Sequence, residues 1–381
     1  MRPDVASNDV GMLCEPSRRP QVAALKRIHE LWMMDRGFHD EYLANPDHAI
    51  AGTGLDVDPR AVSLLLLGRL PEGEADWGNP DGLPETFVWY QELMEGRVKR
   101  NMRARMRNLP DDPRFRDWCL RQLRRCEREL STRARFMTHF PMAFELSSGC
   151  SVGCPFCALS AGRLKGVFRH TEDNAALWRD VLTRMHRVVG DAAGRAVCYC
   201  ATEPLDNPDY ELFLEDFLDE FGRVPQTTTA VATRDIERTR KLLHWGQNAY
   251  LHFDRFSVLS KRNLEVIHSS FTPEELLFTD LLPQFEEAPA SNLMRAGRNR
   301  SADHGTKETI ACASGFIVNM WERSVRLLTP TIVDDEHPTG ELVYERATFT
   351  DGADLEKVVT EMIDRHMHRT ISLGGLLGGG R

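Results

Sequence analysis

The sequence has no long uninterrupted hydrophobic run and no apolar segment near its start. Among its 381 residues, apolar stretches are short, such as Leu64–Leu67, which follows Ser63. A helix that crosses a bilayer needs about 20 apolar residues, so the sequence predicts no membrane span. The opening residues, MRPDVASNDV, lack the apolar region of a secretory signal. We therefore expect a soluble, cytoplasmic protein that does not associate with membranes.

Positive charge is also in deficit, because 48 Lys and Arg residues stand against 57 Asp and Glu residues, a net charge of −9. This balance disfavours a general binder of polyanions, and we expect no nucleic-acid partner. The apolar fraction of 41% and the charged fraction of 28% exclude wholesale disorder. At about 150 residues per domain, the length predicts two or three domains, or one large barrel with attachments.

The N-terminal third shows helical spacing after a short aperiodic start. Residues 1–20 carry Pro, Ser and Gly without periodicity, which predicts a flexible leader. From Val22 onward apolar residues recur at helical intervals, for example at Leu25 and Ile28. We therefore predict a helical N-terminal domain over residues 21–138.

From about residue 139, short β-rich segments alternate with amphipathic segments of helical spacing. The predicted strands are 144–146, 196–202, 226–233, 249–258, 316–320 and 325–328. Strands that alternate with helices of ten to fifteen residues are typical of βα units and a parallel sheet. We predict the α/β class, with a full or partial βα barrel over residues 139–330 whose working face lies at the C-terminal ends of the strands. Residues 331–381 form a C-terminal extension with a Gly-rich tail.

Nine cysteines, an odd number in a chain without a visible secretory signal, favour metal ligands or reactive thiols over disulfides. Cys150, Cys154 and Cys157 follow the first predicted strand within ELSSGCSVGCPFC. A structural zinc site has four ligands, and no second CxxC or HxxxH pair follows within fifteen residues. Three thiolates on a [4Fe–4S] cluster leave one iron open to a chelating small molecule. An incomplete zinc site and three core thiols are the alternatives.

This Cys-x3-Cys-x2-Cys spacing after a strand resembles the radical S-adenosylmethionine (SAM) superfamily. The resemblance implies one [4Fe–4S] cluster and SAM as cofactors, from which a hydrogen-abstracting 5′-deoxyadenosyl radical arises. It implies that Glu203, in ATEP where the superfamily usually has Gly-Gly-Glu-Pro, binds the SAM amino group. Arg255 and Ser257 resemble residues that reach the SAM carboxylate and ribose. Thr229 and Thr233 are candidates for the same pocket, or ordinary polar residues near strand ends.

Longer segments resemble the peptide-maturing epimerases that convert L- to D-residues in proteusin-type ribosomal peptides. The match covers roughly residues 20–340 and rests on ELSSGCSVGCPFC, ATEPLDNPDY, RFSVLSKRNLEVIHSSFTPEEL and SGFIVNMWERSVRLLTP. It implies a ribosomal precursor peptide with a leader as substrate, and a reductant such as flavodoxin or ferredoxin. The reaction would be hydrogen abstraction at Cα, followed by return of a hydrogen from a cysteine thiol.

Cys312 is the only cysteine in the C-terminal third and is therefore our candidate hydrogen donor. The epimerases would place that thiol just after RLLTP, where this chain has Thr331. Without a donor, the substrate radical would end in oxidation, as a cyclopropane or a carbon–carbon crosslink. A non-catalytic metal-binding or peptide-binding module is the third alternative.

Two N-terminal segments bear on peptide recognition. Residues 38–59, FHDEYLANPDHAIAGTGLDVDP, resemble the nitrile hydratase-related leaders of proteusin precursors, or form a helical hairpin. The basic run RVKRNMRARMR at 97–107 either receives an acidic leader or is the solvated face of a helix. Elsewhere, Cys119 and Cys126 lie seven residues apart in a predicted helix, which indicates core positions.

Overall fold

The computed structural model describes residues 14–71, 73, 80–107, 109–130, 137–249, 253–303, 305 and 308–368. The chain divides into two compact units, each assembled from separate stretches. The first unit comprises Met1–Arg103, Gly222–Arg295 and Ser301–Thr306. The second unit comprises Ala104–Phe221, Ala296–Arg300 and Lys307–Arg381. These units do not follow the predicted divisions after residues 138 and 330, because the chain returns to the first unit at Gly222.

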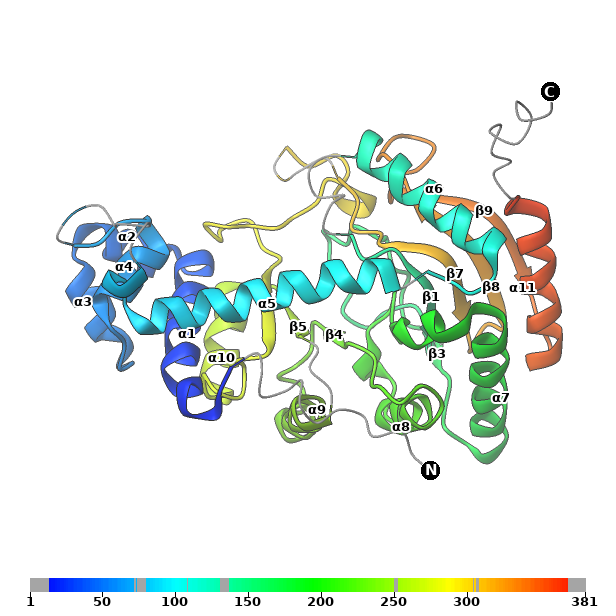
Figure 1. Ribbon diagram of the computed structural model, residues 1–381, viewed down its shortest axis with the longest axis horizontal. Helices are drawn as coiled ribbons and strands as arrows, with labels where there is room; N and C mark the ends of the chain where they lie inside the picture. The colour runs from blue at the N-terminus through cyan, green and yellow to red at the C-terminus, as the bar shows by residue number, and fades with distance from the viewer. Residues whose placement is uncertain are drawn as a thin grey trace, which may run out of the picture. The chain divides into compact units, whose positions relative to one another are not determined.

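A bundle of helices makes up the N-terminal part of the first unit (Figure 1, blue and cyan). Its elements are η1 (Pro16–Arg18), α1 (Arg19–Met34), α2 (Arg36–Ala44), α3 (Pro46–Thr53), α4 (Pro59–Leu67), η2 (Pro80–Gly82) and the first part of α5 (Glu85–Arg107). The side chains of Asp35, Asn45 and Asp58 accept backbone N–H groups at the starts of α2, α3 and α4. Such caps satisfy donors that have no partner inside the helix, so local sequence sets these boundaries.

The segment that resembles a precursor leader is an integral part of this bundle. It forms most of α2 and all of α3, and its Phe38, Tyr42 and Ile50 side chains are buried in the same core as Leu25 of α1. Residues 38–59 are thus largely helical and packed into the bundle, and their likeness to a precursor leader stays a prediction.

The first unit also contains a parallel sheet with strand order β4-β5-β6. Its strands are β4 (Thr228–Thr229), β5 (Asp254–Val258) and β6 (Thr279–Pro283), joined by α9 (Ile236–Ala249) and α10 (Lys261–Ser270). Phe256 and Val258 of β5 are buried and pack in one core with Leu264 and Ile267 of α10. Alternate burial along β5 and β6 is what a sheet covered on one face by helices requires.

The second unit is built on a four-stranded mixed sheet with order β1-β7-β8-β9. The strands are β1 (Phe140–Glu145), β7 (Ala313–Asn319), β8 (Ser324–Pro330) and β9 (Glu341–Thr348). β1 and β7 are parallel, with Glu145 opposite Asn319, whereas β7, β8 and β9 are successively antiparallel. β1 and β7 are buried along their whole length, as strands covered on both faces are.

Helices α6 (Pro113–Glu129), α7 (Glu172–Val189), α8 (Tyr210–Phe221) and α11 (Gly352–His366) complete the second unit. In Figure 1, α7 and α11 run side by side, and Arg184 of α7 donates to Glu356 of α11 at 2.6 Å. Trp178 of α7 is fully buried and its indole N–H donates to the Phe213 carbonyl of α8 at 3.1 Å. On α6, Cys119 and Cys126 are buried, which confirms their prediction as core residues. Buried aromatic and sulfur side chains thus fix the helices against the sheet.

The predicted α/β class is confirmed, but the described strands do not close into a barrel. β8 and β9 are antiparallel, whereas the strands of a βα barrel are parallel, so 325–328 is no barrel strand. The predicted strand 196–202 forms only one bridge, from Val197 to Ala143 of β1. Toward its end this segment does not continue the strand, because the Ala201 N–H donates to the side-chain carboxylate of Glu145 at 3.2 Å.

No helix in the described part of the chain is long and apolar enough to cross a membrane. The Gly-rich tail from residue 369, most of the predicted leader, and the side chains of 100–107 in the basic run lie outside the described residues.

Candidate functional site

The three spaced cysteines lie in one loop of the second unit, which begins just after β1. Ser147–Ser148 (β2) pairs with Gly166–Val167 (β3) and closes the base of this loop. At Gly149, φ is +81°, and a Cβ atom there would lie 2.1 Å from the Arg163 carbonyl oxygen. Only glycine fits this approach, which brings the Cys150 N–H to the Gly162 carbonyl at 2.9 Å. We call residues 149–163 the cysteine loop.

The sulfur atoms of the cysteine loop are half-buried and surrounded by backbone donors. The Val152 N–H points at Cys150 Sγ and the Ala161 N–H at Cys157 Sγ, both at 3.4 Å. Burial, together with the nearby thiols of Cys157 and Cys150, raises the pKa of Cys154 to about 11. The three thiols are thus close enough to repel one another as thiolates, which a bound cation would relieve.

This donor set consists of three thiols in one loop, a ligand type that both zinc and iron–sulfur sites use. Among the described residues, no group of three or more His, Cys, Asp or Glu side chains is placed to hold a metal ion. A [4Fe–4S] cluster spreads its cysteine ligands over separate iron atoms, so its sulfur ligands lie farther apart than those of one tetrahedral zinc. N–H groups directed at sulfur are also among the contacts that tune such clusters.

Two distant segments of the second unit brace the cysteine loop. Asp206 accepts the Ser151 N–H at 2.8 Å and also the Ser151 hydroxyl. On the other side, the Arg298 N–H donates to the Cys157 carbonyl at 3.0 Å. This contact needs Gly297, with φ of +55°, because a Cβ there would lie 2.5 Å from the same carbonyl oxygen. The bracing from 297–298 had no signal in the sequence pattern.

Glu203 lies beside the cysteine loop, as the radical SAM resemblance implies. Its side chain is buried, with 3% of the residue exposed, and it accepts the Leu205 N–H at 3.1 Å. Its charge acts on Cys150: burial is the main cause that raises the pKa of this thiol, and Glu203 and Asp206 add to it. The structure therefore brings together Glu203 and the cysteines, four of the residues predicted from the sequence.

A buried ion pair next to this segment was not predicted. Arg326 of β8 binds both carboxylate oxygens of Glu145 at the end of β1, at 2.8 and 3.1 Å. Asn319 of β7 donates to the same carboxylate at 3.1 Å, as does the backbone of Ala201 at 3.2 Å. Burial lowers the pKa of Arg326, but Glu145 more than compensates and holds it above its usual value. This network anchors the chain two residues before Glu203. In the sequence, the sign of this network is a Glu at the end of an apolar strand, which by itself does not predict an ion pair.

Cys312, the candidate donor, lies in the second unit just before β7. It is half-buried and packs with Cys200 against the apolar face formed by β1, β7 and β8. Burial holds the pKa of Cys200 well above its usual value, with a further contribution from Cys312, so Cys200 is a protonated thiol at neutral pH. Thr331 is buried and its N–H donates to the Gly340 carbonyl at 2.8 Å.

The four other predicted SAM-binding residues, Arg255, Ser257, Thr229 and Thr233, belong to the first unit. Arg255 lies on β5 with its Nε 3.8 Å from Asp280, which also receives both guanidinium nitrogens of Arg97. The Thr229 hydroxyl is buried and accepts the Val231 N–H at 3.0 Å. Ser257 and Thr233 are half-buried. The structure does not bring these residues together with the cysteines inside one unit, and their role stays a prediction.

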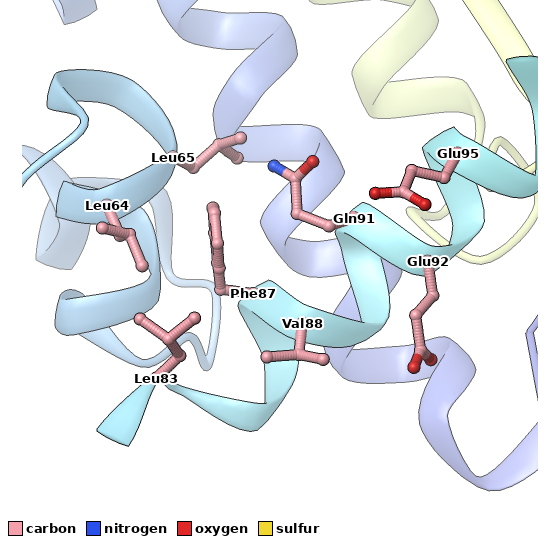
Figure 2. Close-up of a pocket in the computed structure, with 8 residues that line it drawn as sticks. All are labelled: Leu64, Leu65, Leu83, Phe87, Val88, Gln91, Glu92 and Glu95. Atoms are coloured by element: carbon pink, nitrogen blue, oxygen red, sulfur yellow. The ribbon is translucent and has the colours of Figure 1, made fainter. Parts of the chain in front are cut away.

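A separate apolar pocket of about 550 Å³ lies in the helical bundle of the first unit. Figure 2 shows apolar side chains of α4 and α5 facing one another, with Gln91, Glu92 and Glu95 farther along α5. Its lining residues are Leu64, Leu65, Leu83, Phe87, Val88, Gln91, Glu92 and Glu95. The two carboxylates of this pocket form ion pairs, Glu92 with Arg18 and Glu95 with Lys99. None of the site residues predicted from the sequence lines the pocket.

Comparisons with known proteins give one strong match. No family model matches the chain. The uncharacterized protein y4wI of Sinorhizobium fredii is 36% identical over 375 residues, which cover 92% of this chain and 72% of that protein. A solved structure, BtrN in complex with AdoMet and 2-DOIA, aligns over 59% of this chain and 81% of that one, with 14% identity and a TM-score of 0.38. A score this low carries no argument about fold or function.

Proposed function

The chain belongs to the family of the y4wI protein of Sinorhizobium fredii, and we propose that it is a radical SAM enzyme. The observation that carries this proposal is the cysteine loop. Three thiols within eight residues share one braced turn, receive backbone N–H groups, and have the buried carboxylate of Glu203 beside them. A structural zinc site takes four ligands, and the sequence around the cysteine loop offers three cysteines.

In this proposal Cys150, Cys154 and Cys157 hold a [4Fe–4S] cluster, and the cluster with SAM supplies a hydrogen-abstracting 5′-deoxyadenosyl radical. The residues of the chain position these partners. The N–H groups of Val152 and Ala161 stabilise negative charge on the sulfur atoms. The Glu203 carboxylate, which accepts the Leu205 N–H at the start of the short helix Pro204–Asp206, also accepts a charge-assisted hydrogen bond from the SAM ammonium. A flavodoxin or ferredoxin serves as the reductant.

For the substrate we propose a ribosomally made precursor peptide, with L-to-D epimerisation at Cα as the outcome. Support comes from the resemblance of the sequence segments and from the position of Cys312 beside the sheet that carries Glu145. A cysteine thiol suits hydrogen donation, because its S–H bond is weak. Oxidative closure to a cyclopropane or a carbon–carbon crosslink is the alternative, favoured by Thr331 at the position where the epimerases keep a cysteine.

The cluster is tested by anaerobic reconstitution of the full chain with iron and sulfide. We expect absorption near about 400 nm, close to four irons per chain, and reductive cleavage of SAM. Replacement of all three loop cysteines by alanine abolishes these signals, whereas Cys14→Ala, a matched change in the first unit, leaves them intact. Zinc in place of iron, or SAM cleavage by the triple variant, would contradict the proposal and favour a non-catalytic metal-binding module.

The reaction is tested by mass spectrometry of candidate precursor peptides after incubation in deuterated water. A gain of one mass unit with a D-residue on chiral analysis supports epimerisation. A loss of two mass units indicates oxidation and eliminates the epimerase outcome.

A further inference from the structure

One buried carboxylate, that of Glu145, joins the base of the cysteine loop to the segment that carries Glu203. Glu145 ends β1, and only 2% of the residue is exposed. Its Oε1 accepts the Ala201 N–H at 3.2 Å, two residues before Glu203. Its Oε2 accepts the Asn319 side-chain amide at 3.1 Å, and the same amide donates to the carbonyl of Ser147 at 3.0 Å. Ser147 belongs to the strand pair that closes the loop, so one side chain connects both parts of the candidate site.

The segment before Glu203 depends on such tertiary contacts for its shape. The bridge between Val197 and Ala143 of β1 is where it leaves the sheet. Residues 198–203, all of them described, form no strand or helix. Backbone groups outside regular structure need other partners, and they keep one conformation only where those partners hold them. The hydrogen bond from Ala201 to a buried carboxylate is a restraint of this kind.

The orientation of the Glu145 carboxylate is fixed from the opposite side. Arg326 of β8 donates to Oε1 at 2.8 Å and to Oε2 at 3.1 Å. A guanidinium that binds both oxygens fixes the plane of the carboxylate as well as its position. The two oxygens of Glu145 thus accept four hydrogen bonds from Arg326, Asn319 and Ala201, and the side chain acts on the protein rather than on a ligand.

We infer that Glu145 is a positioning residue, which holds the segment of Glu203 in place relative to the cysteine loop. This inference rests on the proposed function, in which Glu203 accepts the SAM ammonium beside the cluster. Glu145 acts through the Ala201 N–H, and Arg326 and Asn319 keep its carboxylate in position. If Glu145 contributed only to stability, any change that restores stability would also restore the site.

Two variants separate positioning from stability, because they change the two in opposite ways. Glu145→Met/Arg326→Met removes both charges and should retain most of the stability, but it leaves the Ala201 N–H without its acceptor. Arg326→Lys keeps a cation beside the carboxylate, so Ala201 keeps its acceptor, while loss of the two-pronged contact lowers stability. Arg184→Met/Glu356→Met is the matched control, since it removes an ion pair between α7 and α11 of the same unit.

The first measurement is hydrogen–deuterium exchange by mass spectrometry on the full chain, before and after reconstitution with iron and sulfide. We expect the peptide that covers residues 198–206 to exchange roughly fivefold to tenfold faster in Glu145→Met/Arg326→Met, as for one lost hydrogen bond. Arg326→Lys and the control should exchange like wild type in this peptide. Wild-type protection in the double variant would overturn the inference, as would an equal loss of protection in Arg326→Lys.

The second measurement is the SAM affinity of the reconstituted protein by equilibrium dialysis, with iron content determined for each variant. We expect SAM to bind about tenfold more weakly to Glu145→Met/Arg326→Met, and within about twofold of wild type to Arg326→Lys and to the control. Wild-type affinity in a double variant whose segment exchanges faster would overturn the inference. A wild-type protein that holds iron but does not bind SAM would instead refute the proposed function, and the exchange data would still show whether Glu145 holds the segment.

Discussion

The cysteine loop of the second unit and strand β5 of the first unit were predicted to serve one cofactor, yet they use their polar groups differently. In the cysteine loop, backbone groups of Gly162, Ser151 and Arg298 make the bracing hydrogen bonds, and the sulfur atoms of the loop accept backbone N–H groups. On β5, the side chains themselves are the braces: Asp254 accepts the Thr227 N–H and Arg255 pairs with Asp280.

This difference separates two kinds of polar residue that look alike in a sequence. A residue whose charge is satisfied by its own fold stabilises that fold, and binding a ligand would first cost the existing ion pair. A residue positioned through its backbone retains the full interaction of its side chain for a ligand. Spacing alone placed the three cysteines in one loop, but it gave no sign that Arg255 lies beside Asp280.

The largest expected effect concerns two carboxylates that pair with arginine, one in each unit: the buried Glu145 and the half-buried Asp280. Glu145→Ala leaves Arg326 buried without its partner, so we expect a loss of about 3–5 kcal/mol in the free energy of unfolding. Asp280→Ala should cost less, because the side chains of Arg97 and Arg255 are partly exposed and regain water. Urea unfolding followed by circular dichroism measures both.

The double variant Glu145→Met/Arg326→Met is the control for that experiment, since removal of both charges leaves no orphan. It should recover most of the stability lost in Glu145→Ala. A double variant as unstable as the single one would show that shape, not charge, is what Glu145 contributes.

The next effect is on SAM affinity and contrasts a predicted residue from each unit. Glu203→Gln removes the charged acceptor but keeps a similar shape, and we expect SAM to bind about 1.5–3 kcal/mol more weakly with iron content unchanged. Ser257→Ala on β5 is the comparison, with less than about 1 kcal/mol expected for a neutral hydroxyl. Isothermal titration under anaerobic conditions reports both. Equal affinities for Glu203→Gln and wild type would remove Glu203 from the site.

The smallest expected effect on stability belongs to Cys312→Ala. The residue is half-buried, so its loss should cost about 1 kcal/mol, as for a typical small truncation. If it donates hydrogen, the variant still cleaves SAM in the presence of a precursor peptide but forms little D-residue. Cys119→Ala, a buried thiol of α6 with no assigned chemistry, is the matched control. Full epimerisation by Cys312→Ala would eliminate Cys312 as the donor.

The sequence predictions were more accurate where the signal came from residues that lie close together in the chain. The helical interval at Val22 and Leu25 correctly indicated α1, and burial of Cys119 and Cys126 followed from their spacing. Strand β9 was missed because its residues are mostly half-exposed, so it lacks the apolar alternation that marks a strand. The segment 196–202 was read as a full strand because it is apolar, although Glu145 draws its backbone out of the ladder at Ala201.

By itself the sequence determined the cysteine spacing, the turn at Gly149 and the caps of the N-terminal helices, because these depend on neighbours a few residues apart and on backbone geometry. Only the tertiary structure decided that Arg326 neutralises Glu145, that Gly297 brings Arg298 against Cys157, and that Arg255 lies beside Asp280. Those contacts join residues that are 25 to 181 positions apart in the printed numbering, where no periodic pattern carries information about which partner a side chain meets.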